Sequence, residues 1–205
     1  MSRLLVASRN PGKLRELRVL LAGEDVALDT LTSYESVGEI EETGETFEEN
    51  AGIKASHAAR LTGLWTLGED SGIVVDALGG APGVLSARYA GVHGDDAGNN
   101  RKLISELQRV ENRAARYVCA LALANPQGDV VATVHGVSEG RIVDEPRGSG
   151  GFGYDPYFVP EGESRTNAEL SANEKSTISH RGRAVRAFIP MLRLHLRLRP
   201  VDPGG

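Results

Sequence analysis

The chain has 205 residues, of which 40% are hydrophobic and 25% charged, and its net charge is −5. This composition is ordinary for a globular domain, and a chain of this length can bury about 70% of its unfolded surface. The negative charge argues against a broad nucleic-acid-binding surface, and no apolar run approaches the ~20 residues that cross a membrane. The single cysteine, Cys119, excludes an intrachain disulfide and is expected to be buried in its apolar run. We therefore expect a cytoplasmic protein that binds neither nucleic acid nor membranes.

The first elements are a short strand, a polar loop and a helix. Residues 4–7 form an apolar run typical of a buried strand, and Asn10 then suits the cap of a helix that starts at Pro11. Leucines recur at helical spacing through Leu21. Lys13 lies in the first turn, where a cation opposes the helix dipole. An anionic partner such as phosphate is one interpretation of this loop, and an ordinary capped helix is the other.

A second strand is expected at residues 27–31, followed by an acidic loop at residues 39–49. Thr46 and Glu49 match a capping box, which predicts a helix over residues 47–61. One face of that helix is predicted to carry three polar side chains: Asn50, Lys54 and His57.

A carboxylate suited to chemistry follows this helix. We predict a strand over residues 65–67, a sharp turn at Asp70-Ser-Gly72 and a resumed strand over residues 73–75. Magnesium takes oxygen ligands and keeps several waters, so one or two carboxylates plus phosphate oxygens suffice to bind it. Ser71 has no evident histidine–acid partnership, which leaves attack by water, activated by a carboxylate or a metal, as the simpler chemistry. The metal candidates, each with a solvated surface position as the alternative, are Glu41, Glu42 and Asp70.

The second half of the chain alternates strands and helices. A helix around residues 103–110, a hairpin of residues 116–124 and 130–137, and a final helix over 185–196, interrupted or kinked at Pro190, are predicted. The intermixed elements indicate an α/β or mixed α+β fold, with a long mixed sheet flanked by helices. We expect one domain over residues 1–199, with two lobes around a central cleft, and a disordered tail at residues 200–205.

Two segments of this half suit a nucleotide. Gly148-Ser-Gly-Gly-Phe-Gly153 matches the dinucleotide-binding pattern, but no helix is expected after it, so that interpretation is rejected. The segment is either a flexible loop or a backbone that presents Phe152 to a base. Further on, residues 175–183 carry several donors that suit phosphate or a carbonyl-rich base, although a solvated basic helix start is the alternative: Lys175, His180, Arg181 and Arg183.

Taken together, the motifs resemble one family. The inosine triphosphate pyrophosphatases, Ham1-like enzymes that remove non-standard purine nucleotides, carry similar motifs in the same order, and the resemblance extends over about residues 3–198. The motifs are Ser8-Arg-Asn-Pro-Gly-Lys13, Glu41-Glu-Thr-Gly44, Phe47-Glu-Glu-Asn50 with Lys54-Ala55, Asp70-Ser-Gly72, Gly80-Ala-Pro-Gly83 with Ser86-Ala-Arg-Tyr89, Gly150-Gly-Phe-Gly-Tyr-Asp155 and Ser179-His-Arg-Gly182.

This resemblance implies a homodimer that hydrolyses ITP, dITP and XTP to the monophosphate and pyrophosphate with Mg²⁺. Asp70 would be the general base and, with Glu41, would hold the metal. The triphosphate would be bound by Ser8, Arg9, Asn10, Pro11, Gly12, Lys13, Lys54 and Ser71. The base would be stacked and bordered by Phe152, Gly153, Tyr154 and Asp155, and its edge would be read by Lys175, His180 and Arg181.

One departure and two alternatives accompany the resemblance. Many relatives have Asp-Asp-Ser-Gly where this chain has Glu69-Asp-Ser-Gly, which puts a helper role of Glu69 in metal binding in doubt. A nucleotide pyrophosphatase of other base specificity, with thymidylate- or uridylate-type substrates, is the first alternative. The second is a non-catalytic nucleotide sensor, against which the joint presence of Asp70, Glu41 and Lys13 argues.

Overall fold

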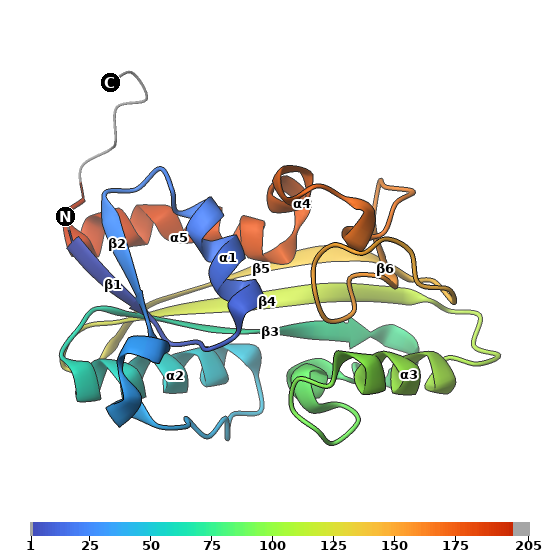
Figure 1. Ribbon diagram of the computed structural model, residues 1–205, viewed down its shortest axis with the longest axis horizontal. Coiled ribbons are helices and arrows are strands. Elements are labelled where there is room, and N and C mark those ends of the chain that lie inside the picture. Colours follow the sequence, from blue (N-terminus) through green and yellow to red (C-terminus); the bar gives the residue numbers. More distant parts are fainter. Residues whose placement is uncertain (1, 199–205) are drawn as a thin grey trace. The chain divides into compact units, whose positions relative to one another are not determined.

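The computed structural model describes residues 2–198, and the tail predicted at residues 200–205 lies outside the described residues. Its six strands form one sheet in the order β2-β1-β3-β4-β5-β6 (Figure 1). The strand β1 pairs in parallel with β2 and β3, whereas β5 pairs antiparallel with β6. The predicted mixed sheet flanked by helices is therefore confirmed.

The chain divides into two compact units. Among the described residues, unit 1 contains residues 2–70, 120–136 and 183–198, and unit 2 contains residues 71–119 and 137–182. The boundary falls inside β3, β4, β5 and α5, so four elements contribute residues to both units.

Unit 1 begins as predicted. The strand β1 (Ser2–Val6) leads into α1 (Pro11–Leu20), and the side chain of Asn10 caps this helix. The strand β2 (Val26–Thr30) returns beside β1, with Leu4 opposite Leu28. Two short 3₁₀ helices follow it: η1 (Leu31–Ser33) and η2 (Glu35–Val37).

The helix α2 (Phe47–Thr62) packs closely on the sheet in unit 1. Its capping box between Thr46 and Glu49 is present, and Gly63 ends it in the left-handed conformation. A Cβ at Gly68 of β3 would meet the backbone carbonyl of Ala51, so only glycine allows this approach. In Figure 1, α2 lies on one side of the unit 1 strands and α5 on the other.

The turn predicted at residues 70–72 is wrong. The strand β3 (Thr66–Val75) runs without interruption through Asp70, Ser71 and Gly72. Glycine at position 72 does not signal a turn, because a Cβ there would collide with the Ser86 hydroxyl. Glycine occurs here because the strand packs closely against Ser86. Residue type alone does not distinguish such a close contact from a turn.

The strands β4 (Ala114–Ala124) and β5 (Val130–Ile142) are neighbours in the sheet, and both are longer than predicted. The turn between them is held by Asn125, whose side chain accepts hydrogen bonds from the N–H groups of Gln127 and Asp129. Cys119 is buried in β4, as expected.

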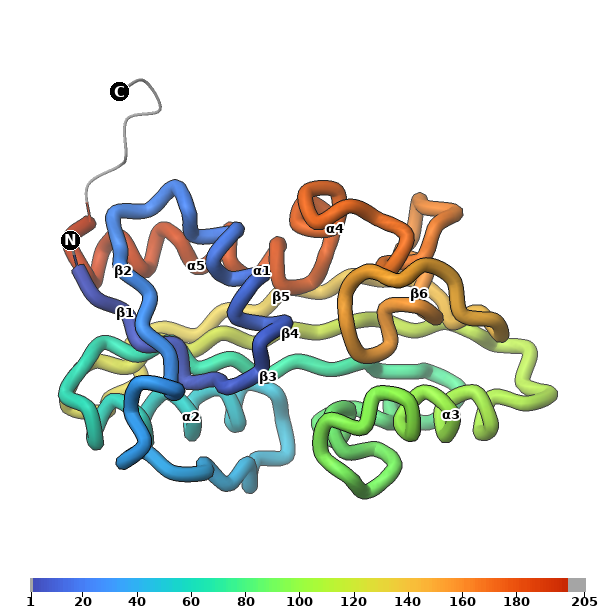
Figure 2. Tube along the Cα trace, in the orientation of Figure 1, coloured from blue at the N-terminus to red at the C-terminus, as the bar shows by residue number. Residues whose placement is uncertain are grey.

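Unit 2 is built around a cluster of buried apolar residues that includes Ile73, Leu103, Tyr117 and Phe158. The helix α3 (Asp96–Glu106) begins earlier than predicted, and its last turn ends before Val110. Its coil is easily followed in the tube of Figure 2, between residues 95 and 106. The remaining elements are η3 (Asp76–Leu78), η4 (Gly83–Arg88), β6 (Phe158–Pro160), η5 (Asn167–Glu169) and α4 (Ala172–Ile178).

The final helix α5 (His180–Leu196) starts five residues before the predicted 185 and continues through Pro190, so Pro190 does not interrupt it. In unit 1, Arg193 Nε and Nη2 donate to the two carboxylate oxygens of Glu24, each at 2.8 Å. The only tryptophan of the chain, Trp65, lies 5.9 Å from the His195 ring, measured between centroids. Within residues 2–198, no helix combines the length and the apolar character needed to cross a membrane.

Candidate active site

A buried ion cluster lies in unit 1. The Lys54 side chain extends from α2, and its Nζ lies 2.9 Å from Asp70 Oδ1 and 3.0 Å from Glu42 Oε1. Burial favours the neutral amine, but the carboxylates of Asp70 and Glu42 outweigh it and raise the pKa of Lys54 above its usual value. Lys54 is therefore a fixed cation between two acids.

Asp70 is the carboxylate best suited to chemistry. It is 5% exposed, and its Oδ2 receives no hydrogen bond from the residues that the structure describes. Burial raises the pKa of Asp70, while the charges of Lys54 and Lys13 oppose the rise. A buried carboxylate with a raised pKa and one oxygen without a hydrogen-bond partner can accept a proton from water or bind a cation.

The donor set of this cluster fits a divalent cation. Asp70 supplies an oxygen without a hydrogen-bond partner within residues 2–198, and Glu42 is a second carboxylate bound to the same lysine. Across the described residues there is no group of three or more histidine, cysteine or acidic side chains placed to hold a metal. Two carboxylates still suit Mg²⁺, which fills its other positions with water and phosphate oxygens. Glu41, the other predicted ligand, is exposed.

The loop before α1 offers a second cation. The Oδ1 atom of Asn10 accepts from the N–H groups of Gly12 and Lys13, so the cap satisfies two donors that the helix start would otherwise present to an anion. Arg9 donates to the backbone carbonyl of Gly38 at 2.6 Å. Lys13, in the first turn of α1, places its Nζ 3.6 Å from Oε1 of Glu69 in β3.

In unit 2, Asp155 organises the glycine-rich loop. Its Oδ2 accepts from Lys175 Nζ at 2.6 Å and from the Phe152 N–H at 2.8 Å. Its Oδ1 accepts from Asn167 Nδ2 at 3.1 Å. A Cβ at Gly151, where φ is 71°, would collide with the same carboxylate. The loop is thus ordered around Asp155 rather than flexible.

Two buried cations face the Phe152 ring. Lys175 Nζ lies 5.2 Å from the ring centroid and Arg181 Cζ lies 5.6 Å from it. Arg181 is 1% exposed, and its Nη2 donates to Ser71 Oγ at 3.1 Å. An aromatic face beside two donor-only side chains suits a planar ring that carries carbonyl oxygens.

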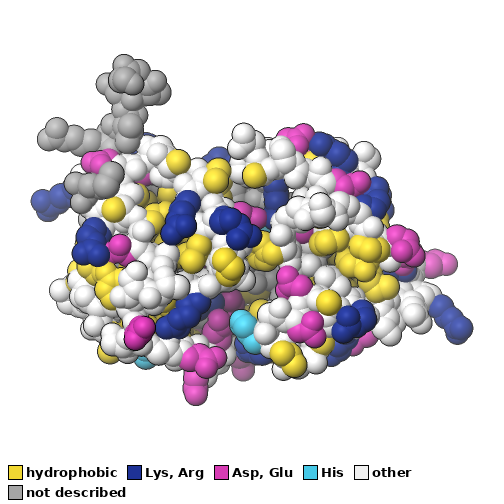
Figure 3. Space-filling view, viewed as in Figure 1, with side chains coloured by type: hydrophobic (Ala, Val, Ile, Leu, Met, Phe, Trp, Pro, Cys, Tyr) yellow, Lys and Arg dark blue, Asp and Glu magenta, His cyan; other side chains and the backbone are white. Residues whose placement is uncertain are grey.

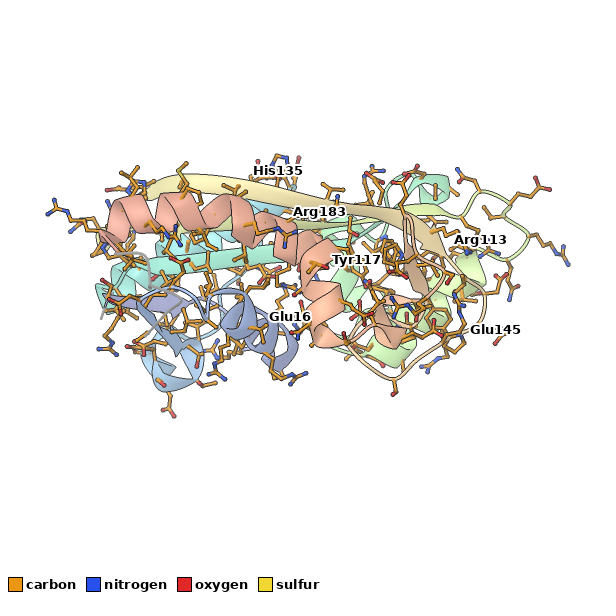
Figure 4. All side chains as sticks on the ribbon, turned by 90° about the horizontal axis from the view of Figure 1, so that it is seen from above. Glu16, Arg113, Tyr117, His135, Glu145 and Arg183 are labelled. Carbon is orange, nitrogen blue, oxygen red and sulfur yellow. The ribbon has the colours of Figure 1, made fainter. Side chains whose placement is uncertain are left out.

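His180 serves a different role from these cations. Its ring stacks on Tyr117 at 4.6 Å between centroids and 9° between planes, and the residue is 3% exposed. Tyr117, labelled in Figure 4, belongs to β4 in unit 2, whereas Arg183 lies one residue into unit 1 on α5. The basic segment read from the sequence is therefore divided between the units.

The structure groups the expected site residues into two sets. Unit 1 brings Lys54 to Asp70, and unit 2 brings Phe152 to Lys175 and Arg181. Figure 3 shows basic and acidic side chains interspersed on the surface, so burial rather than a charged surface distinguishes these cations.

Sequence reasoning missed two polar residues at the start of α3. Asp96 Oδ2 accepts from the Gly153 N–H, and Asn100 Nδ2 donates to the Gly153 carbonyl. The four-residue spacing of these side chains, just after the capping residue Asp95, is the signal that indicates one polar helix face. The sequence around α3 does not predict which loop this helix face contacts.

Known proteins resemble the chain over nearly its whole length. A family model described as the Ham1 family matches residues 4–191. A protein named dITP/XTP pyrophosphatase from Streptomyces coelicolor is 48% identical over 197 residues, covering 94% of this chain and 98% of that protein. A protein of the same name from Mycolicibacterium paratuberculosis is 52% identical, covering 97% and 100%. The solved HAM1 protein from Coxiella burnetii has a TM-score of 0.85 and 43% identity, covering 95% of this chain and 100% of that one.

Proposed function

The chain belongs to the Ham1 family, and from this premise we propose that it hydrolyses dITP, XTP and ITP to the monophosphate and pyrophosphate. The observation that carries the proposal is Asp70. It is a buried carboxylate with a raised pKa, bound by Lys54 at one oxygen and, among the described residues, without a hydrogen-bond partner at the other. A protein that only bound nucleotides would need the cations but not this group.

Asp70 acts as the general base. Its Oδ2, which has no hydrogen-bond partner in the described part of the chain, takes a proton from a water molecule whose oxygen forms a bond to the α-phosphorus, while the bond to the bridging oxygen breaks and pyrophosphate leaves. The raised pKa of the Asp70 carboxyl strengthens it as a proton acceptor, because a base is most effective when its pKa approaches the working pH.

Magnesium would be held by Asp70 with Glu41 or Glu42, and when bound it would offset phosphate charge.

The lysines of unit 1 bind the triphosphate. Lys13 and Lys54 both pair with carboxylates, at 3.6 Å and about 3 Å, so the anionic substrate competes for cations that are already positioned. Ser8 to Gly12 shape the loop from which Lys13 extends.

The residues of unit 2 select the base. Phe152 stacks on the purine, an interaction worth about 1–3 kcal/mol per base. Lys175 and Arg181 can only donate, so they match the 6-oxygen of hypoxanthine or xanthine and oppose the 6-amino group of adenine. A buried mismatch of this kind can discriminate by about 10⁴-fold. Gly153 and Tyr154 follow Phe152 in the same turn, and His180 stacks on Tyr117.

The proposal includes an assembly and a location. We place the enzyme in the cytoplasm, as expected from the composition of the sequence. Following the family resemblance, we propose that it is a homodimer and uses Mg²⁺.

Activity on a panel of nucleotides tests the proposed function. Purified protein is incubated with dITP, XTP, ITP, dATP, dGTP and dTTP, with Mg²⁺ or with a chelator, and pyrophosphate and single phosphate are measured separately. We expect pyrophosphate from dITP, XTP and ITP only in the presence of Mg²⁺. Stepwise release of single phosphates, or equal rates on dATP, would overturn the assignment, and preference for dTTP would favour another base specificity.

A further inference from the structure

The turn at residues 152–155 in unit 2 is held from several sides. The Asp155 carboxylate accepts from the Phe152 N–H at 2.8 Å, and the Asp155 N–H returns a hydrogen bond to the Phe152 carbonyl at 3.3 Å. The Tyr154 hydroxyl donates to the backbone carbonyl of Ser86 at 2.8 Å. These contacts order the residues on both sides of Gly153 but leave Gly153 itself to be held by another element.

That element is α3. The Gly153 N–H donates to Asp96 Oδ2 at 2.8 Å, and the Gly153 carbonyl accepts from Asn100 Nδ2 at 2.9 Å. The two side chains are four residues apart, so they project from one face of the helix. Gly153 has a φ of 63°, in the left-handed region that glycine tolerates, and both its backbone polar groups are bound to a single helix.

The helix α3 is itself anchored in unit 2. The Asn99 side chain accepts from the Ala90 N–H at 2.8 Å and donates to the Ala87 carbonyl at 3.3 Å. Leu103, one turn further on, is fully buried in the apolar cluster of unit 2. The face that holds Gly153 is therefore a rigid support and not another mobile loop.

We propose that Asp96 and Asn100 are positioning residues for base recognition, which hold Gly153 so that the neighbouring Phe152 ring stays beside Lys175 and Arg181. The inference rests on the proposed function, because it takes the Phe152 ring to be the surface on which the purine stacks. Both residues bind the backbone of Gly153. They act through the backbone, and a turn that is ordered before binding avoids the cost of ordering it with the ligand.

Kinetics with dITP test this role. Asp96→Ala and Asn100→Asp each remove one hydrogen bond to Gly153, and each should raise KM about 5–10-fold, the scale of one lost hydrogen bond, with a smaller change in kcat. Asp96→Asn retains an acceptor oxygen and should restore a KM near that of the wild type. Because Asp96 is exposed, its variants keep the test decisive even where Asn100→Asp fails to fold.

Asp95 provides the matched control. Its side chain caps the same helix through the Gly98 N–H at 2.9 Å and makes no contact with Gly153. Asp95→Ala should lower the melting temperature while the KM for dITP stays unchanged. A rise in KM equal to that of Asp96→Ala would show that loss of helix stability explains both, and would overturn the proposal.

Hydrogen exchange separates this inference from the proposed function. In ligand-free protein, the amides of residues 148–155 should exchange faster in Asp96→Ala and Asn100→Asp than in the wild type or Asp95→Ala. Unchanged exchange, or faster exchange with an unchanged KM, would contradict a positioning role. If the wild type released no pyrophosphate, the proposed function would fall, and the affinity for inosine monophosphate would take the place of KM: weaker binding by both variants supports the inference, and equal binding overturns it.

Discussion

Lys54 shows how single residues set the chemistry of unit 1. One ammonium group serves two carboxylates at about 3 Å, so the cluster of Lys54, Asp70 and Glu42 carries one more negative than positive charge. Breaking a buried ion pair by removing one partner typically costs about 3–5 kcal/mol, because the remaining charge is left uncompensated. When Asp70 is neutralised, Lys54 is still paired with Glu42. We therefore expect removal of the Asp70 charge to destabilise the fold less than removal of the Lys54 charge.

That asymmetry makes Asp70 a clean test of catalysis. Asp70→Asn keeps the size of the side chain but removes the proton acceptor, and we expect kcat to fall by about 10²–10⁴-fold, the usual contribution of a general base. The melting temperature should change little. Asp76→Asn is the control, since Asp76 pairs with the partly exposed Arg116 at 2.8 Å and lies outside the ion cluster. Wild-type turnover in Asp70→Asn would remove Asp70 from the mechanism.

The roles of some residues could be predicted from their neighbours in the sequence, and the roles of others could not. Asn10 and the Thr46–Glu49 pair cap their helices as expected, because capping depends on neighbours within a few positions. Whether Glu41 or Glu42 approaches Lys54 depends on how the acidic loop folds back across α2, which no local pattern encodes. The contact goes to Glu42.

At the scale of elements, the errors have physical reasons. The turn expected at Asp70-Ser-Gly72 was inferred from composition, yet β3 is continuous because Gly72 provides room for Ser86. The start of α3 was missed because apolar periodicity begins only at Leu103, and the preceding turns contact loops through polar side chains. Amphipathic periodicity finds the buried part of a helix and overlooks a polar part that supports a binding loop.

The capping box of α4 gives a pH-dependent prediction. Hydrogen bonds from the Ser171 side chain and backbone, with Arg165, lower the pKa of Glu174 from 4.5 to about 2. A depressed pKa means that the carboxylate stabilises the folded state above pH 4.5, and that this contribution is lost as the pH falls through about 2. Glu174→Gln should therefore lower the melting temperature at pH 7, and the difference from the wild type should shrink as the pH falls from 4.5 towards 2.

Glu163→Gln is the control for that titration. Glu163 also binds Arg165, at 3.2 Å, but it caps no helix. At pH 7, the melting temperature of Glu163→Gln should lie closer to that of the wild type than the melting temperature of Glu174→Gln does. A difference for Glu174→Gln that stayed constant down to pH 2 would show that the cap acts without its charge.

On the scale of the whole molecule, the fold class was predictable, while the positions at which the chain passes from one unit to the other were not. Alternating strand and helix patterns, together with the family motifs, indicate a mixed sheet flanked by helices. The division passes through β3 between Asp70 and Ser71, two consecutive residues of one strand, and no change in composition marks it. The periodicity of apolar residues identifies a helix or strand, but it does not say which of the two units each residue of that element packs in.

Assembly is the prediction that belongs to this scale. If the family resemblance holds for oligomeric state, light scattering at micromolar concentration should give about twice the chain mass of 21.8 kDa. An isologous two-fold contact is the commonest form of such a dimer. From the sequence, residues 79–89 either contribute to that contact through Pro82 and Tyr89 or form a loop that covers the mouth of the cleft. A mass of one chain with full activity at the same concentration would exclude the dimer from the mechanism.

The position of Trp65 determines what fluorescence can report about this protein. It is the only indole in the chain, and it lies in unit 1 beside His195 near the end of α5. Its emission during denaturation therefore follows the environment of one unit, whereas far-ultraviolet circular dichroism follows the secondary structure of both. Coincident curves would indicate a single cooperative transition, and separated curves would show that the units melt independently despite the strands they share.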